Sequence, residues 1–191
     1  MKINTAFFTA ASLLLLPGFA FAQDQAYLEQ ETELYAQCIS DAAADPETSL
    51  DMALTWRDTG GGLPARHCVA LSYTGLGKYQ AAALEFETLA DEMSRGLGWI
   101  FKGVEHPGER GLLADVYNQG GNAWLLAGDP IKAYDLFTIG LSLENVDPGT
   151  TANLLVDRAL ANGEMGDYQS ALDDITKVQF LVQENADLYV L

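Results

Sequence analysis

The chain has 191 residues, of which 27 are acidic and ten are basic, so its formal net charge at pH 7 is −17. A protein this negative repels nucleic-acid phosphates and anionic lipid headgroups, which excludes nucleic acid as a partner and favours a neutral or basic protein. A solvated acidic surface without a partner is the alternative, and it is the commoner case. Hydrophobic residues make up 49% of the chain, which excludes a wholly disordered protein. The length is typical of one domain.

Residues 1–22 are predicted to be a signal peptide. A positive charge at Lys2 precedes an apolar stretch over 5–16, and the Ala-Phe-Ala motif at 20–22 supplies the small residues that a signal peptidase requires. An uncleaved anchor is the alternative, but the apolar stretch is shorter than the ~20 residues of a membrane span. We therefore expect cleavage before Gln23, no stable membrane insertion afterwards, and a periplasmic protein, with full secretion as the alternative.

Three segments of the remaining chain repeat one pattern. Segments 76–86, 127–137 and 165–175 each have glycine as their second residue. Alanine follows five residues after the glycine, a large apolar residue follows nine after it, and a small residue lies seven before it. These positions are filled by Gly77, Ala82, Phe86 and Ala70, by Gly128, Ala133, Phe137 and Gly121, and by Gly166, Ala171, Ile175 and Ala159.

The repeated glycine indicates the turn of a helical hairpin. Glycine readily adopts the positive φ that ends a helix, and Asp129 and Asp167, which follow it in two copies, are good N-caps for a second helix. The Gly-x-Gly-Lys stretch ending at Lys78 has a phosphate-binding loop as its alternative interpretation. Such a loop requires a preceding strand, whereas the residues before Gly75 follow a helical pattern. We therefore interpret this stretch as a hairpin turn as well.

The pattern resembles the tetratricopeptide repeat family over roughly residue 64 to the end of the chain. The copy around Gly128 matches best, through Tyr117, Gly121, Trp124, Gly128, Ala133 and Phe137. The resemblance implies an all-α fold, a right-handed α-α superhelix of helical hairpins. The sequence departs from the family at four positions: Arg66 and Leu155 replace an early aromatic or large residue, Asn162 replaces a later aromatic, and Arg158 occupies a normally apolar position.

A weaker copy lies upstream at 44–54, where Asp45 and Pro46 match Asp129 and Pro130. The predicted organisation is a signal peptide at 1–22 and one helical repeat domain at 23–191, with repeats at about 26–57, 63–93, 114–146 and 152–185. The long gap between the second and third copies implies an insertion at about 94–111. Residues 186–191 are expected to start a further helix, and Leu188, Tyr189, Val190 and Leu191 form a candidate edge for self-association.

Cys38 and Cys68 are expected to form a disulfide, because an exported protein meets an oxidising compartment. The resemblance places both in the first helices of consecutive repeats, which stack side by side in this family. A catalytic thiol at Cys68 beside His67 is the alternative, but neighbours in a helix point about 100° apart. A zinc site formed by these residues with His106 lacks the short ligand spacings of known zinc sites.

No other segment predicts an enzyme. The carboxylate pairs Asp173–Asp174 and Asp91–Glu92 are expected on exposed helix faces, where charges are solvated. The sequence has no calcium-binding loop with alternating Asp or Asn residues around a central glycine. We therefore predict no catalytic residue, no metal and no cofactor.

Binding is the function that the resemblance implies, because the first helices of these repeats line a concave groove. An amide pairs with both the donor and the acceptor of a peptide backbone, which makes Asn118 and Asn122 candidate contacts. Satisfying neighbouring helix groups is the alternative. The groove lacks the lysines and arginines with which chaperone adaptors of the family hold a terminal carboxylate. The candidate groove residues are His67, Leu71, Asp115, Asn118, Asn122, Leu125, Asn153, Val156, Leu160 and Glu164.

The insertion supplies a second candidate surface. Trp99, Ile100 and Phe101 are candidate contacts, because exposed aromatic residues form interface hot spots. Folding back onto the helices is the alternative. The sequence thus predicts an exported scaffold or adaptor that binds a partner segment in its groove. A structural or self-assembling repeat protein joined through its C-terminal edge is the first alternative, and a thiol- or metal-dependent protein using Cys68 and His67 is the second.

Overall fold

The computed structural model describes residues 18–96, 98–101, 104–107 and 110–188, and their side chains within 29–96 and 112–183. Within these ranges the chain forms eight helices and one two-stranded hairpin, so the fold is all-helical apart from that hairpin. Residues 1–17 of the predicted signal peptide lie outside the described residues, as do residues 189–191 of the predicted further helix.

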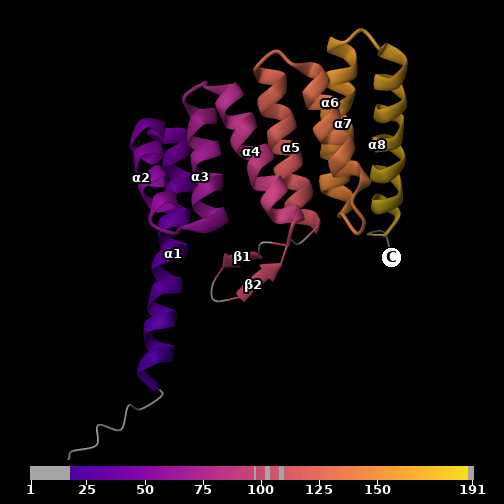
Figure 1. The fold of residues 1–191 in the computed structure, drawn as a ribbon. Coiled ribbons are helices and arrows are strands. Elements are labelled where there is room, and N and C mark those ends of the chain that lie inside the picture. Colours follow the sequence, from indigo (N-terminus) through magenta and orange to yellow (C-terminus); the bar gives the residue numbers. More distant parts are fainter. Residues whose placement is uncertain (1–17, 97, 102–103, 108–109, 189–191) are drawn as a thin grey trace, which may run out of the picture.

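The helices form a row in chain order, from indigo to yellow in Figure 1. Each helix packs against the next, and α1 also contacts α3, as α5 contacts α7. The row therefore consists of four hairpins, α1–α2, α3–α4, α5–α6 and α7–α8. The elements are α1 Gly18–Ala44, α2 Pro46–Asp58, α3 Gly62–Gly75, α4 Tyr79–Ser94, β1 Gly98–Phe101, β2 Val104–Pro107, α5 Arg110–Leu126, α6 Pro130–Ser142, α7 Pro148–Glu164 and α8 Tyr168–Leu188.

Three of the hairpin turns share one backbone structure. The φ angles of Gly77, Gly128 and Gly166 are 69°, 80° and 83°. In each turn the glycine N–H donates to the carbonyl three residues back, and the following N–H donates to the carbonyl five residues back. This pair of bonds is a Schellman motif, which satisfies the last carbonyls of the first helix. The hairpin interpretation of Gly77 is confirmed, because this turn joins the helices α3 and α4.

In the α1–α2, α5–α6 and α7–α8 hairpins, an aspartate caps the start of the second helix. The side chains of Asp45, Asp129 and Asp167 each accept a hydrogen bond from the backbone N–H three residues later. Proline follows Asp45 and Asp129 in the first turn, where its missing N–H leaves no bond unmade. The hydrogen bonds from the Ser170 hydroxyl and N–H hold the pKa of Asp167 below its ordinary value. The predicted caps at Asp129 and Asp167 are confirmed.

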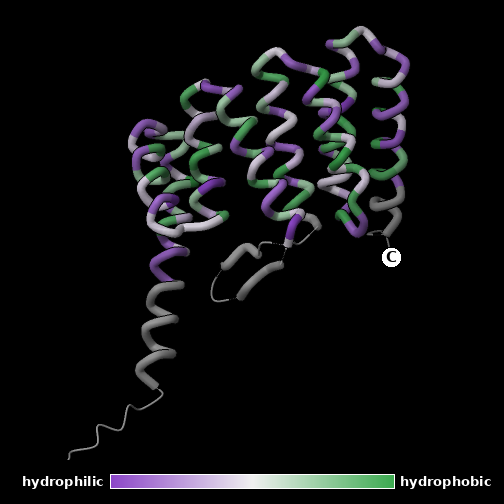
Figure 2. The backbone as a smooth tube through the Cα atoms, in the orientation of Figure 1, coloured by the Kyte–Doolittle hydropathy of each residue, from purple (hydrophilic) through white to green (hydrophobic). Residues whose placement is uncertain are grey.

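The core runs between the helices along the whole row. Hydrophobic and hydrophilic residues alternate along the helices in Figure 2, as expected for amphipathic helices. Close approach of α5 and α6 depends on a glycine, because a Cβ at Gly121 would overlap the ring of Phe137. At Gly121, the small residue of the repeated pattern is therefore a packing requirement. The largest fully buried side chains include Phe137, Leu89, Met93, Leu154 and Val69.

The insertion folds as a β-hairpin, which the sequence analysis did not predict. β1 pairs antiparallel with β2, so that Trp99 lies opposite His106 and Phe101 opposite Val104. β1 lies near α3 and α1. The sequence of β1 explains the strand, because Trp99, Ile100 and Phe101 are aromatic or β-branched and such residues favour extended backbone. The side chains of Trp99, Ile100 and Phe101 lie outside the described residues, so their role as contacts stays a prediction.

Two helix ends differ from the expectation. α1 begins at Gly18, so the cleavage point predicted before Gln23 falls inside a helix. α8 continues through Leu188, so residues 186–188 end this helix and do not start another. The physical reason is that no glycine or proline occurs between Tyr168 and Leu188 to end the helix sooner.

A disulfide and a hydroxyl pair join the first two hairpins. Cys38 on α1 is bonded to Cys68 on α3, with their Cα atoms 6.0 Å apart. Beside this bond, the hydroxyls of Ser49 on α2 and Ser72 on α3 lie 2.8 Å apart and share a hydrogen bond. Both serines are buried. The α1–α2 hairpin is therefore held to α3 by covalent and polar links as well as by apolar packing.

Candidate binding surfaces

His67 does not line an open groove. Its buried ring lies where α1, α3 and α5 meet, with Nδ1 2.7 Å from the Tyr35 hydroxyl and Nε2 2.7 Å from Gln119 Oε1. An amide oxygen only accepts, so Nε2 carries the proton and Nδ1 accepts from Tyr35. Burial lowers the pKa of His67, and the bond to Gln119 opposes this only in part. His67 is a neutral link between helices, which corrects its prediction as a partner-binding residue.

The two asparagines of α5 bind a carboxylate of α7. The Nδ2 atoms of Asn118 and Asn122 donate to the same oxygen, Asp157 Oδ2, at 2.7 and 2.8 Å. Asn122 Nδ2 also lies 3.3 Å from Asn118 Oδ1. We call Asn118, Asn122 and Asp157 the amide cluster. It gives both amides a partner on a neighbouring helix, which was the alternative to peptide binding.

Three more groove candidates also make contacts within the protein. Asp115 accepts a hydrogen bond from the Thr150 hydroxyl at 3.1 Å. Burial raises the pKa of Asp115, although the bond from Thr150 works in the opposite direction. Leu71 and Leu125 are half-buried and pack against the core. These residues therefore present only part of their side chains to a ligand.

The remaining four candidates form an exposed stripe on α7. Asn153, Val156, Leu160 and Glu164 are spaced by three or four residues and so share one face of the helix. Val156 is 43% exposed and Leu160 is 54% exposed. We call these four residues the α7 stripe. Of the predicted groove, this part is the most accessible to a partner.

Sequence reasoning missed a second apolar surface, on α8. Phe86 and Phe137 lie nine residues after their turn glycines and are 2% and 0% exposed, because the following helices α5 and α7 cover them. Ile175 has the same position in the last hairpin and is 36% exposed. No described helix follows α8. We call the exposed residues Tyr168, Leu172, Ile175 and Val182 the terminal face.

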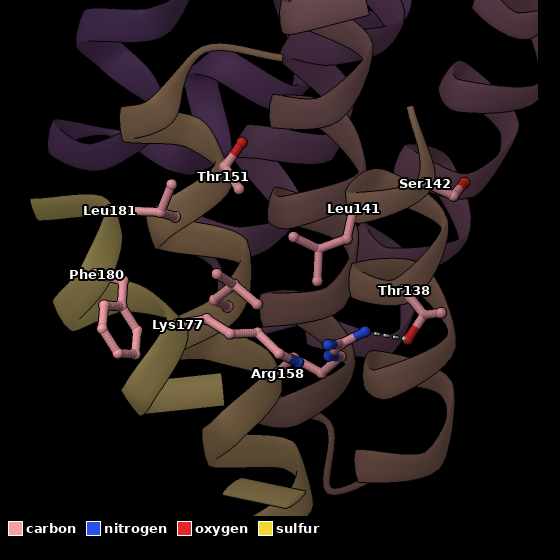
Figure 3. A pocket seen from close by; sticks show the side chains of 9 residues that line it. Thr138, Leu141, Ser142, Thr151, Arg158, Lys177, Phe180 and Leu181 are labelled. Carbon is pink, nitrogen blue, oxygen red and sulfur yellow. Dashed lines mark hydrogen bonds between the residues drawn. The ribbon is translucent and has the colours of Figure 1, made fainter. Parts of the chain in front are cut away.

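A pocket of about 600 Å³ opens between α6, α7 and α8 (Figure 3). Four of its nine lining residues are leucine or phenylalanine, three carry a hydroxyl and two are cationic. Two cationic side chains, Arg158 and Lys177, lie at one side of it in Figure 3. We call it the α6–α8 pocket. Its lining includes Thr138 and Leu141 of α6, Leu155 and Arg158 of α7, and Lys177, Phe180 and Leu181 of α8.

Asp174, beside this pocket, corrects the expectation of a solvated carboxylate. It is 2% exposed, and both its oxygens accept from Arg158, at 2.8 Å each. Lys177 Nζ lies 2.8 Å from Asp174 Oδ1. Burial acts to raise the pKa of Asp174, but the hydrogen bonds from Arg158 and Lys177 outweigh it and lower the pKa. The carboxylate can be buried because a partly buried arginine compensates its charge.

Cys68 and His67, which were considered for thiol chemistry, each have a partner within the protein, and the side chain of His106 lies outside the described residues. The sulfur of Cys68 is bonded to Cys38, so no thiolate is available beside His67. Among the side chains that the structure describes, no three His, Cys, Asp or Glu residues lie close enough to hold a metal ion. The thiol-dependent alternative is therefore corrected for the disulfide-bonded protein.

Comparisons with known proteins add no identification. A scan against protein-family models and a search of curated proteins each return no match for this chain. Within the described ranges, no helix combines the length and the hydropathy needed to cross a bilayer.

Proposed function

We propose that this protein is an exported scaffold of tetratricopeptide-type hairpins, wound as a right-handed superhelix, that binds a segment of another protein. The α7 stripe is the observation that carries the proposal. It places two exposed aliphatic side chains one helical turn apart, between an exposed amide and an exposed carboxylate. Exposed apolar side chains framed by polar ones are typical of a peptide-binding surface.

The regularity of the fold supports the repeat assignment. The turns at Gly77, Gly128 and Gly166 make the same two backbone bonds, and the residues seven before them are small and buried. In such an array the first helices α3, α5 and α7 would line one concave face. The α7 stripe would then lie beside the amide cluster on this face.

The charge of this face selects the partner. The α7 stripe carries Glu164 and no basic residue, and Asp157 of the amide cluster lies next to Val156 in the sequence. The whole chain has a net charge of −17. A segment with one or two large apolar residues flanked by lysine or arginine fits both the aliphatic pair and the carboxylates. Its affinity is expected to fall as salt is added.

A peptide display library selected on the purified full chain tests this proposal. We expect selected peptides to combine large apolar residues with lysine or arginine. The double change Val156→Ser and Leu160→Ser removes two partly exposed aliphatic contacts. It should weaken a selected peptide by about 2 kcal/mol, or roughly thirtyfold in Kd.

The matched control changes two aliphatic residues on second helices that are at least as exposed, Leu84→Ser and Ile131→Ser. This variant should bind the selected peptide as tightly as the original protein. Equal weakening in both double variants, or selection of peptides without a basic and apolar pattern, would count against the proposal.

Self-assembly is the second candidate function, and the terminal face favours it. Its four exposed apolar side chains lie on α8, and in the preceding hairpins the next helix packs against the corresponding side of α4 and α6. The net charge of −17 opposes the approach of two copies, so assembly should strengthen with salt. Sedimentation over a range of protein and salt concentrations decides this: a monomer under all conditions removes self-assembly.

A further inference from the structure

We propose that the α6–α8 pocket binds a single-chain amphiphile with an anionic head, of the medium-chain carboxylate class. This site is independent of the partner segment proposed for the α7 stripe. Its volume of about 600 Å³ lies in the range of ~300–1,000 Å³ that is usual for ligand sites. The argument rests on why the pocket is hollow, on its charge and on its apolar walls.

The pocket is hollow because a leucine stands where the preceding hairpin has a tyrosine. Tyr117 and Leu155 both lie eleven residues before their turn glycines, so they have equivalent places in their hairpins. Tyr117 packs against the core and approaches Gly140 of α6. Leu155 is shorter and lines the pocket. The missing aromatic ring leaves space that an apolar ligand can occupy.

The charge at the pocket is positive in a strongly negative protein. Arg158 and Lys177 bring two positive charges, and Asp174 brings one negative charge. The guanidinium is held in place by two bonds to Asp174 and by one from Nη1 to the Thr138 hydroxyl at 3.2 Å. Lys177 has an ammonium with three donors, of which one bonds Asp174, and its side chain is 56% exposed. These three side chains together carry one net positive charge, which matches a single anionic headgroup.

Besides the hydroxyls of Thr138, Ser142 and Thr151, the lining has apolar side chains from all three helices that suit a hydrocarbon chain. Leu141 of α6, Leu155 of α7 and Leu181 of α8 lie on its walls, and Phe180 of α8 stands at the rim. Phe180 is among the exposed large hydrophobic residues, so a bound chain would cover it. An apolar wall beside a fixed cationic group excludes cationic amphiphiles and gives small hydrophilic anions little to bind.

Calorimetric titration of the full chain with sodium octanoate, decanoate and dodecanoate, below their micelle concentrations, tests the proposal. Affinity should rise with chain length by up to about fourfold for each added methylene. In ¹H–¹⁵N spectra, dodecanoate should shift the amides of 138–142, 151–158 and 177–181. Dodecyltrimethylammonium, which has the same tail and a cationic head, should not shift them.

Two variants test head and tail separately. Lys177→Glu reverses an exposed charge and should weaken dodecanoate at least tenfold; circular dichroism checks that the variant is folded, because the new carboxylate faces Asp174. Leu155→Trp fills the hollow from α7 and should weaken it by a similar factor. Leu172→Ser, on the terminal face, is the matched control and should bind dodecanoate like the original protein.

Three results would overturn the proposal. The first is that dodecanoate shifts amide resonances across the terminal face and still does so in Lys177→Glu, since this would show general adsorption of the tail. Another is equal binding of dodecanoate and dodecyltrimethylammonium. The third is tighter binding at these residues of a short peptide ending in two leucines with a free carboxylate, since the pocket would then be a site for a protein terminus.

Discussion

Replacing Asp174 with asparagine is expected to destabilise the protein by about 3 kcal/mol, because it leaves Arg158 in the interior without its carboxylate. Removing one partner of a buried ion pair costs ~3–5 kcal/mol. The lower end applies here, since 15% of the Arg158 side chain is exposed and the second partner, Lys177, is largely in solvent. Asparagine keeps the shape of the side chain, so the loss reports the charge.

Urea unfolding at pH 7, followed by circular dichroism, measures this effect. With a slope of about 2 kcal/mol per molar urea, the midpoint should fall by roughly 1.5 M. The double variant Arg158→Met and Asp174→Leu is the decisive comparison. It replaces the pair with apolar side chains; in the preceding hairpin Leu136 occupies the position of Asp174 and Gly120 that of Arg158. Such replacements are often neutral or stabilising.

Acid provides an independent check of the same pair. The folded-state pKa of Asp174 is lowered, so its stabilising contribution is present above the ordinary carboxyl pKa and is lost as pH falls through the folded value. The Asp174→Asn variant should therefore lose less stability than the original protein between pH 5 and pH 3. A single-variant cost below about 1 kcal/mol, or a double variant as unstable as the single one, would refute this account of the buried pair.

Three further changes have expected outcomes. Reducing the Cys38–Cys68 disulfide, which closes a loop with a sequence separation of 30, should cost ~3–4 kcal/mol, measured as the difference in urea midpoint with and without reductant. Because the folded pKa of His67 lies below its ordinary 6.5, stability should be full above that pH and fall as pH drops towards the folded pKa. His67→Gln should show a flatter stability profile between pH 7.5 and pH 5, and an unchanged slope would contradict the assignment. Gly121→Ala should destabilise by about 1–3 kcal/mol through overlap with Phe137, whereas Gly163→Ala, with open space around its Cβ, should stabilise by up to ~1 kcal/mol; thermal unfolding compares them.

The turns and caps were predictable because they depend on local residues. A glycine that needs positive φ and an aspartate that caps the next helix act within a few residues of one another. The positions at Gly128 and Asp129 could therefore be identified without tertiary structure. Small residues at the helix crossings could be predicted too, because a repeated pattern shows them three times.

The accessibility of the predicted groove residues was harder to predict, because it depends on contacts with residues far away in the sequence. His67 has the spacing of a groove residue, but Tyr35 and Gln119, from two other helices, enclose it. The side-chain amide of Asn118 donates a hydrogen bond to Asp157, which lies 39 residues later. The terminal face could not be predicted from the pattern either: Ile175 has the position that is buried in the preceding hairpins, but it is 36% exposed and no described helix follows α8.

The disulfide makes the two ends of the row unequal in their resistance to local opening. In an array of hairpins each unit is stabilised mainly by its neighbours, so the outermost units open most easily. Cys38 and Cys68 hold the first hairpin to the second, whereas among the described residues α7–α8 packs against one hairpin and carries no cross-link. Unfolding should therefore begin at α8, where amide hydrogen exchange would be fastest. The α7 stripe, the terminal face and much of the α6–α8 pocket lie on this last hairpin. A ligand that binds only the closed form would keep it closed, as the disulfide does at the opposite end.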